Sequence, residues 1–149
     1  NHAAPGEECR HNLVYWRYGE YAGVGPGAHG RLIVMRGDAP TTVATRQHRA
    51  PEAWLAQVEA NGHATRSFDP VSEAEQRDEL TLMGLRLSEG LDAARVQKRL
   101  GKELFSLYAP ERVTRLVEEG LLVRDERGLR ATPSGRLRLN AVIDYLLGG

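Results

Sequence analysis

The sequence predicts an α+β fold in which a strand-rich unit, residues 1–71, precedes a helical unit, residues 72–149. Short runs of β-branched and aromatic residues before residue 46 favour strands. Beyond residue 72, capping residues and glycines frame longer amphipathic segments, which favours helices. We therefore expect the boundary between the units near residues 68–72.

Three strands are expected in the first unit. Residues 21–25 have the pattern of a short buried strand that ends in a glycine-rich loop. Residues 31–36 and residues 41–46 are two further candidates, and the turn signal of residues 37–40 lies between them. The last two candidates therefore predict a β-hairpin.

One helix is expected in the first unit, beginning at Pro51 because proline favours the first helical position. The helix should end near residues 61–62, where a glycine follows an asparagine. The side chains expected to face inwards are Trp54, Leu55 and Val58.

The second unit begins with a capping box, in which the side chains of Ser72 and Glu75 can each accept a hydrogen bond from a free backbone N–H. The helix that follows is expected to run to Gly90. Gly84 should weaken its interior by roughly 1 kcal/mol relative to alanine, unless it allows close packing. The apolar residues that predict this helix are Leu80, Met83 and Leu87, with Leu82 and Leu85 beside them.

Three more helices and a hairpin are expected in the second unit. Asp92 caps a short helix, and Pro110 begins another that ends at Gly120. Residues 121–131 have the pattern of a β-hairpin around a charged turn. The final helix is capped by Thr132, and its apolar side chains are Leu137, Leu139, Val142, Ile143, Leu146 and Leu147. This order of elements is winged-helix-like.

The charge balance argues against a nucleic-acid partner. The chain has 20 basic and 20 acidic residues, and they cancel again on each side of residue 72. A neutral balance lacks the summed field that draws proteins to polyanions. No run of about 18 apolar residues occurs, so no transmembrane segment is expected.

Cys9 is the only cysteine of the chain. One thiol cannot form an intramolecular disulfide and cannot hold an iron–sulfur cluster alone. A cytoplasmic location is therefore expected. The chain starts at Asn1 without an initiator methionine, so we expect it to be a piece of a longer protein.

The sequence signal for a binding site lies in residues 9–16 and 23–30. The first segment combines a histidine with aromatic residues, and four of the eight residues in the second are glycine. Glycines raise the entropic cost of folding, so such a loop is typical where positive φ is needed or where a ligand approaches the main chain.

These segments resemble the radical-SAM family of oxygen-independent coproporphyrinogen III oxidases, and within it the haem-chaperone branch, HemW. The matching residues follow the family's order over nearly the whole chain. They lie in residues 9–16, 21–29, 82–91, 116–122 and 132–140.

The resemblance implies a parent protein with a partial (β/α) barrel, a 4Fe–4S cluster on a three-cysteine motif, and S-adenosylmethionine bound to the cluster. That motif is absent here, so both cofactors are expected only in the full-length parent, and this chain alone is expected not to be catalytic. Residues 1–71 then correspond to the last strands and helix of the barrel, and residues 72–149 to a C-terminal winged-helix-like domain. The residues implied to face S-adenosylmethionine or substrate are Gly25, Gly27, Ala28 and His29.

His11, Asn12 and Tyr15 match a motif through which the chaperone branch is proposed to contact haem. Imidazole is a common axial ligand of haem iron, and tyrosine can also bind the iron. His11 is therefore the first candidate for the haem iron. A structural histidine without a ligand remains the alternative, as does a simple connecting role for the glycine loop.

The favoured function is the C-terminal portion of a radical-SAM haem chaperone. Its implied partners are haem or porphyrin, the N-terminal radical-SAM barrel and haem-receiving client proteins. Within the family, the alternative is the oxidase, which oxidatively decarboxylates two propionates to vinyl groups. From another class, the predicted order of elements allows a winged-helix nucleic-acid-binding regulator, although Asp125 and Glu126 at the hairpin tip argue against phosphate contacts.

Overall fold

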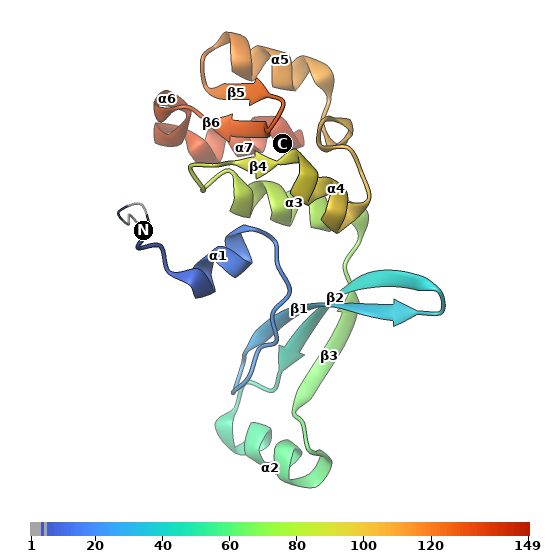
Figure 1. Ribbon diagram of the computed structural model, residues 1–149. Helices are drawn as coiled ribbons and strands as arrows, with labels where there is room; N and C mark the ends of the chain where they lie inside the picture. The colour runs from blue at the N-terminus through green and yellow to red at the C-terminus, as the bar shows by residue number, and fades with distance from the viewer. Residues whose placement is uncertain (1–3, 5) are drawn as a thin grey trace. The chain divides into compact units, whose positions relative to one another are not determined.

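Figure 1 shows the computed structural model of the chain, which describes Ala4 and residues 6–149. Residue contacts divide the chain into two compact units. Unit 1 is Asn1–Tyr15 with Gly19–Glu75, and unit 2 is Trp16–Tyr18 with Gln76–Gly149. Each unit combines helices with a small sheet, so the predicted α+β class is confirmed. The start of the chain, on which the expectation of a longer protein depended, lies largely outside the described residues.

Unit 1 is built on a three-stranded antiparallel sheet in the order β1-β2-β3 (Figure 1). β1 (His29–Arg36) and β2 (Ala39–Gln47) form the predicted hairpin, and Gly37 adopts a φ of 62° in its turn. β3 (Thr65–Pro70) has no counterpart in the sequence prediction. The sequence of β3 lacks the apolar alternation that signals a strand. Its backbone pairing with β2 holds it in the extended conformation instead.

α2 (Pro51–Asn61) connects β2 to β3 and ends as predicted, with Gly62 at a φ of 75° as its C-cap. Its predicted inward face is only partly correct. Trp54 and Val58 are half-buried, but Leu55 is 51% exposed. Residues four apart lie above one another on a helix, whereas Leu55 is rotated by about 100° from that narrow contact face.

The predicted strand at residues 21–25 is wrong. Tyr21 and Arg31 form a single bridge through two backbone hydrogen bonds of 2.8 and 2.9 Å. Beyond it the chain leaves the sheet, and Val24 is 84% exposed. Gly25 adopts a φ of 109°, a conformation that ends any extended strand.

Helix α1 (Arg10–Trp16) precedes this loop and was not expected from the sequence. Its mixture of aromatic and β-branched residues favours strands. A contact from outside the helix helps to decide the outcome, because the ring of Tyr15 packs edge-on against Tyr21 with 4.4 Å between centroids. Tertiary packing here overrides a weak local preference.

α3 (Glu73–Gly84) begins at the predicted capping box. Ser72 Oγ accepts a 3.2 Å hydrogen bond from the Glu75 backbone N–H, and the Ser72 N–H donates to Glu75 Oε2 at 2.8 Å. The hydrogen bonds from Ser72 also hold the pKa of Glu75 below its usual value. The capping box is therefore confirmed in both directions.

The prediction that this helix runs to Gly90 is wrong, because it ends at Gly84. A Cβ on Gly84 would lie 2.4 Å from Cδ2 of Leu91, which begins the short strand β4 (Leu91–Asp92). The missing side chain therefore allows the close packing that the sequence left open. Leu85, just after the helix, is completely buried.

The remaining elements of unit 2 follow the predicted order. Asp92 caps the next helix, since its Oδ1 accepts a 2.7 Å hydrogen bond from the Arg95 N–H. The elements are α4 (Ala93–Leu100), the 3-10 helix η1 (Leu104–Leu107), α5 (Pro110–Glu118), β5 (Leu122–Asp125), β6 (Gly128–Ala131), α6 (Pro133–Leu137) and α7 (Leu139–Leu147). The hairpin of β5 and β6 is as predicted, and β4 joins it in an antiparallel sheet of order β4-β6-β5. None of the described helices has both the length and the apolarity to cross a membrane.

The predicted final helix is divided into α6 and α7 at Arg138, which has a φ of −119°. Val142, Ile143 and Leu146 are buried and share one face of α7. Leu137, which the sequence analysis named among the apolar side chains of this helix, lies outside the stripe and is 89% exposed.

Unit 2 contains most of the apolar core. Its completely buried leucines come from the turn after α3, from η1 and from both strands of the hairpin; they are Leu85, Leu104, Leu122 and Leu129. Unit 1 has a smaller core around the completely buried Val43 of β2. We therefore expect unit 2 to be the more resistant to unfolding.

A buried hydroxyl pair gives unit 2 a specific pH dependence. Thr81 Oγ1 donates its single proton to the Arg77 carbonyl at 2.6 Å, so Tyr108 must be the donor in its 2.6 Å contact with Thr81. Burial raises the pKa of Tyr108 to about 12.

Stability that depends on the neutral phenol of Tyr108 should be complete below pH 10 and should decline as the pH rises towards 12, because the unfolded tyrosine ionises near pH 10. We expect the free energy of unfolding in urea to fall by about 2 kcal/mol more in the wild type than in Tyr108→Phe over this interval. Tyr145→Phe, which alters an exposed tyrosine, should keep the wild-type dependence. Parallel curves for the wild type and Tyr108→Phe would contradict the assignment.

Candidate functional site

The predicted haem-contacting residues lie on α1. His11 and Tyr15 are four residues apart and therefore share a helix face, where His11 Nε2 and the Tyr15 hydroxyl are 2.7 Å apart. Their rings meet edge-on with centroids 4.7 Å apart. His11 is exposed, whereas Asn12 and Tyr15 are half-buried. The structure thus brings His11 and Tyr15 into direct contact.

This contact constrains which imidazole nitrogen could bind a metal. If Nε2 carries the proton and donates to the Tyr15 oxygen, Nδ1 keeps its lone pair and makes no hydrogen bond to any described residue. If Tyr15 donates instead, Nε2 reaches a metal only after Tyr15 turns away. Both imidazole and phenol are haem ligands, so the donor chemistry of this pair fits a haem iron.

The other potential metal-binding side chains of the described residues do not form a cluster. Cys9 is exposed and has a free thiol. Within residue 4 and residues 6–149, no group of three or more His, Cys, Asp or Glu side chains is placed to hold a metal ion. A haem iron differs from such a site because the porphyrin supplies four ligands, and the protein supplies only the axial ones.

Of the predicted cofactor-facing residues, Gly25, Gly27 and Ala28 lie in the loop that leads into β1, and His29 is the first residue of that strand. Gly25 and Gly27 adopt φ values of 109° and 72°, so both need glycine for their backbone conformation. Two amides of this loop are already used internally. The Gly27 N–H donates to the His48 carbonyl at 2.7 Å, and the Ala28 N–H to the Gly25 carbonyl at 3.2 Å. Open space for a ligand therefore remains beside Gly25, where a Cβ would meet no atom within 4 Å.

Two other glycines of this region are fixed by close packing. A Cβ on Gly23 would lie 2.2 Å from the His29 carbonyl oxygen, and one on Gly30 would lie 2.4 Å from Thr45 Oγ1. The connecting role that the sequence left open therefore applies to Gly23 and Gly30. Gly25 has no atom within 4 Å of such a Cβ, so packing does not explain it.

A polar hollow beside this loop was missed by the sequence analysis. Two of the predicted residues, Gly27 and His29, line it together with Arg46, Gln47, Arg49, Arg66, Ser67 and Asp69; we call it the basic groove. Its volume of about 410 Å³ falls within the range of small-molecule sites. The arginines come from β2, the turn after it and β3, so only strand pairing brings them together.

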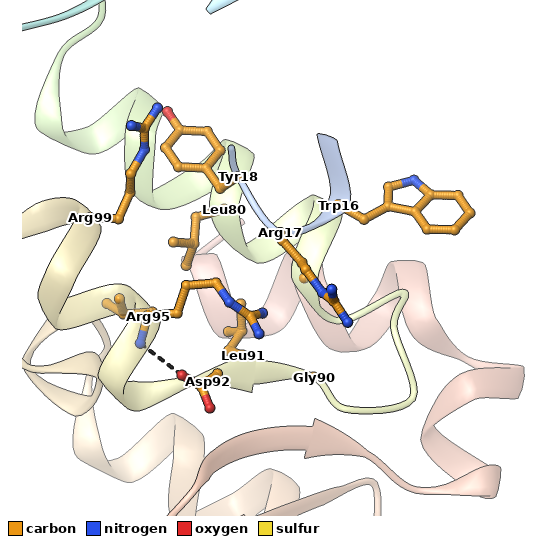
Figure 2. Close-up of a pocket in the computed structure, with 11 residues that line it drawn as sticks. Trp16, Arg17, Tyr18, Leu80, Gly90, Leu91, Asp92, Arg95 and Arg99 are labelled. Carbon is orange, nitrogen blue, oxygen red and sulfur yellow. Dashed lines mark hydrogen bonds between the residues drawn. The ribbon is translucent and has the colours of Figure 1, made fainter. Parts of the chain in front are cut away.

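A second hollow lies in unit 2, where residues 16–18 pack against α3, β4 and α4 (Figure 2). Arg17 binds Glu89 through two hydrogen bonds of 2.9 and 3.0 Å, and Arg95 adds a third of 3.0 Å. The hydrogen bond from Arg17 is the main cause that lowers the pKa of Glu89. The hollow has room for about one water molecule, at about 10 Å³, so this contact anchors the chain and is not a ligand site.

Comparison with known proteins shows which family and which relatives this chain resembles. Residues 71–138 match the family described as HemN C-terminal domain. Bovine radical S-adenosyl methionine domain-containing protein 1, mitochondrial, is 40% identical over 99% of this chain and 33% of its own length. Heme chaperone HemW of Bacillus subtilis is 31% identical over 99% of this chain and 37% of its own length. The chain thus spans about a third of these relatives.

A solved structure of coproporphyrinogen III oxidase, HemN, from Escherichia coli matches this chain with a TM-score of 0.58. The match covers 98% of this chain and 35% of the HemN chain. At 18% identity this likeness shows the fold alone.

Residues 71–138 therefore match a HemN C-terminal domain in sequence, and the fold of the chain matches about a third of HemN. Nearly the whole chain is similar to the haem chaperone HemW and to radical S-adenosyl methionine domain-containing protein 1, which agrees with the resemblance found in the sequence. These matches do not favour the nucleic-acid-binding regulator.

Proposed function

We propose that this chain serves a haem chaperone rather than the decarboxylating oxidase, and that α1 carries its haem contact. The observation behind this proposal is the His11–Tyr15 pair, in which an exposed imidazole lies 2.7 Å from a phenol on one helix face. The 31% identity to the Bacillus subtilis haem chaperone over nearly the whole chain supports the same choice.

In this proposal His11 supplies an axial ligand to the haem iron. Tyr15 acts as a positioning residue, because a hydrogen bond to one imidazole nitrogen fixes which nitrogen is free for the metal. Asn12, one turn before Tyr15, would offer an amide to the periphery of the porphyrin. Bound haem would be cargo for client proteins, so no reaction is assigned to this chain alone.

The proposal for the whole protein extends beyond this chain. A radical-SAM barrel on the N-terminal side would hold the 4Fe–4S cluster, and S-adenosylmethionine or substrate would approach Gly25, Gly27, Ala28 and His29. Winged-helix character of residues 72–149 and a cytoplasmic location stay predictions. The name of the bovine relative includes the word mitochondrial, so the two compartments are best compared by localising the full-length protein.

Substitution of His11 tests the haem proposal directly. We expect His11→Ala to change the Soret band of the haem-loaded chain and to weaken haem affinity at least about tenfold, or 1.4 kcal/mol, because an axial ligand is lost. Tyr15→Phe keeps His11 as the axial ligand, so it should weaken haem binding less than His11→Ala does. His63→Ala removes another exposed histidine of unit 1 and is the matched control. Identical spectra and affinities for His11→Ala and the wild type would remove His11 from the site.

A further inference from the structure

The basic groove lies on one face of the unit 1 sheet. His29 of β1 pairs with Arg46 of β2, and Arg46 pairs with Ser67 of β3, so the three side chains form one row across the sheet. Asp69 lies two residues beyond Ser67 and therefore projects from the same face. Because His29 is one of the candidate cofactor-facing residues, this row connects the groove to them.

A β-bulge adds a second arginine to this face. Gln47 pairs with Thr65 while Arg46 pairs with Ser67, so Arg66 is the extra residue of β3 between two pairs. In a regular strand, Arg66 would point away from the face that carries Ser67. A bulge redirects a side chain, and here both Arg66 and Ser67 line the groove.

The charges of the groove are unbalanced. Arg46, Arg49 and Arg66 make no ion pair or side-chain hydrogen bond with any residue that the structure describes, and Asp69 is the only carboxylate of the lining. Three guanidinium groups around one hollow repel one another unless an anion lies between them. The Ser67 hydroxyl oxygen is buried and has no hydrogen-bond partner, which leaves a donor unused on the groove's lining.

We propose that the basic groove binds the oxyanions of a ligand that carries at least two carboxylate or phosphate groups. Guanidinium forks bind both kinds of oxyanion through paired N–H donors, and the Ser67 hydroxyl adds a neutral donor. Arg49 packs its stem near Gly27, where a Cβ would lie 3.6 Å from Arg49 Cγ, so the groove and the glycine loop form one continuous surface. The choice of a tetrapyrrole's propionates as the first source rests on the proposed function, whereas the anion site itself does not.

The test measures binding of two probes to the full 149-residue chain. Coproporphyrin III supplies carboxylates and is followed by fluorescence anisotropy, with its tetramethyl ester in the same detergent as the uncharged comparison. Inorganic pyrophosphate supplies phosphates and is followed by calorimetry. We expect the double variant Arg46→Gln/Arg66→Gln to weaken binding of the recognised probe at least about tenfold, since two charge-assisted contacts are lost.

The matched control is the double variant Arg36→Gln/Arg136→Gln, which removes two exposed arginines outside the groove. It should change affinity less than about twofold, which excludes an effect of net charge alone. The variant Arg46→Lys keeps the charge but loses the fork, so it should give an intermediate loss. Circular dichroism of each variant checks that the sheet is intact.

Each outcome decides the proposal. Arginine-dependent binding of coproporphyrin III but not of its ester supports carboxylates as the source, and arginine-dependent binding of pyrophosphate alone supports phosphates. If neither probe distinguishes the groove variant from the control, the proposal is overturned. His11→Ala should leave pyrophosphate binding unchanged, so loss of the haem contact and loss of the groove site are separately visible.

Discussion

Gly23→Ala should dismantle the glycine loop while leaving unit 2 folded. Its Cβ would lie 2.2 Å from the His29 carbonyl oxygen and 2.6 Å from the carbonyl carbon, both backbone atoms that cannot rotate away. We expect a cost of at least about 3 kcal/mol in the stability of this region, the upper end for overpacking. Hydrogen exchange should show it at the amides of Tyr21 and Arg31, whose mutual hydrogen bonds hold the loop to β1.

The control for this loop substitution is Gly37→Ala at the tip of the β1–β2 hairpin. Gly37 has a φ of 62° but open space around its Cα, so alanine there should cost only about 1 kcal/mol of backbone strain. Exchange at Tyr21 and Arg31 should stay at the wild-type rate in Gly37→Ala. Unchanged protection of these amides in Gly23→Ala would show that the loop does not depend on the close approach to His29.

Leu104→Ala should strongly destabilise unit 2. Leu104 belongs to η1 and is completely buried within the core that α3, α4, α5, α7 and the hairpin share. Removing its side chain loses transfer free energy and leaves a cavity, and such substitutions cost about 2–5 kcal/mol. We expect a loss near the upper part of that range, measured by urea unfolding with circular dichroism at neutral pH.

Leu137→Ala is the matched control because it makes the same change at a leucine that is 89% exposed. It should alter stability by less than about 0.5 kcal/mol. Equal losses for Leu104→Ala and Leu137→Ala would mean that the core is not packed as described.

The elements that the sequence predicted well carry their own local signals. The capping box at Ser72 and Glu75, the Asp92 cap and the hairpin around Gly128 each depend on residues close together in the chain. The His11–Tyr15 contact is equally local, although the resemblance rather than the spacing singled out these two residues. His11 and Tyr15 meet because they are one helical turn apart, although the helix itself was not expected.

The elements that were missed or misplaced depend on distant partners. β3 is a strand because β2 pairs with it, and α3 ends at Gly84, against which the distant Leu91 packs. The basic groove is a stronger example. Arg46 and Arg66 are twenty residues apart in sequence, and only the register of two strands and a bulge places them on one lining.

The amino-acid sequence by itself determined the family resemblance, the α+β class and the short-range devices that begin and end its helices. Those features follow from residue type and local spacing, which the chain carries before it folds. The tertiary structure decided which glycines are fixed by packing, where the helices end and which arginines face one hollow. These depend on contacts between segments far apart in the chain, and no local pattern encodes the register that brings them together.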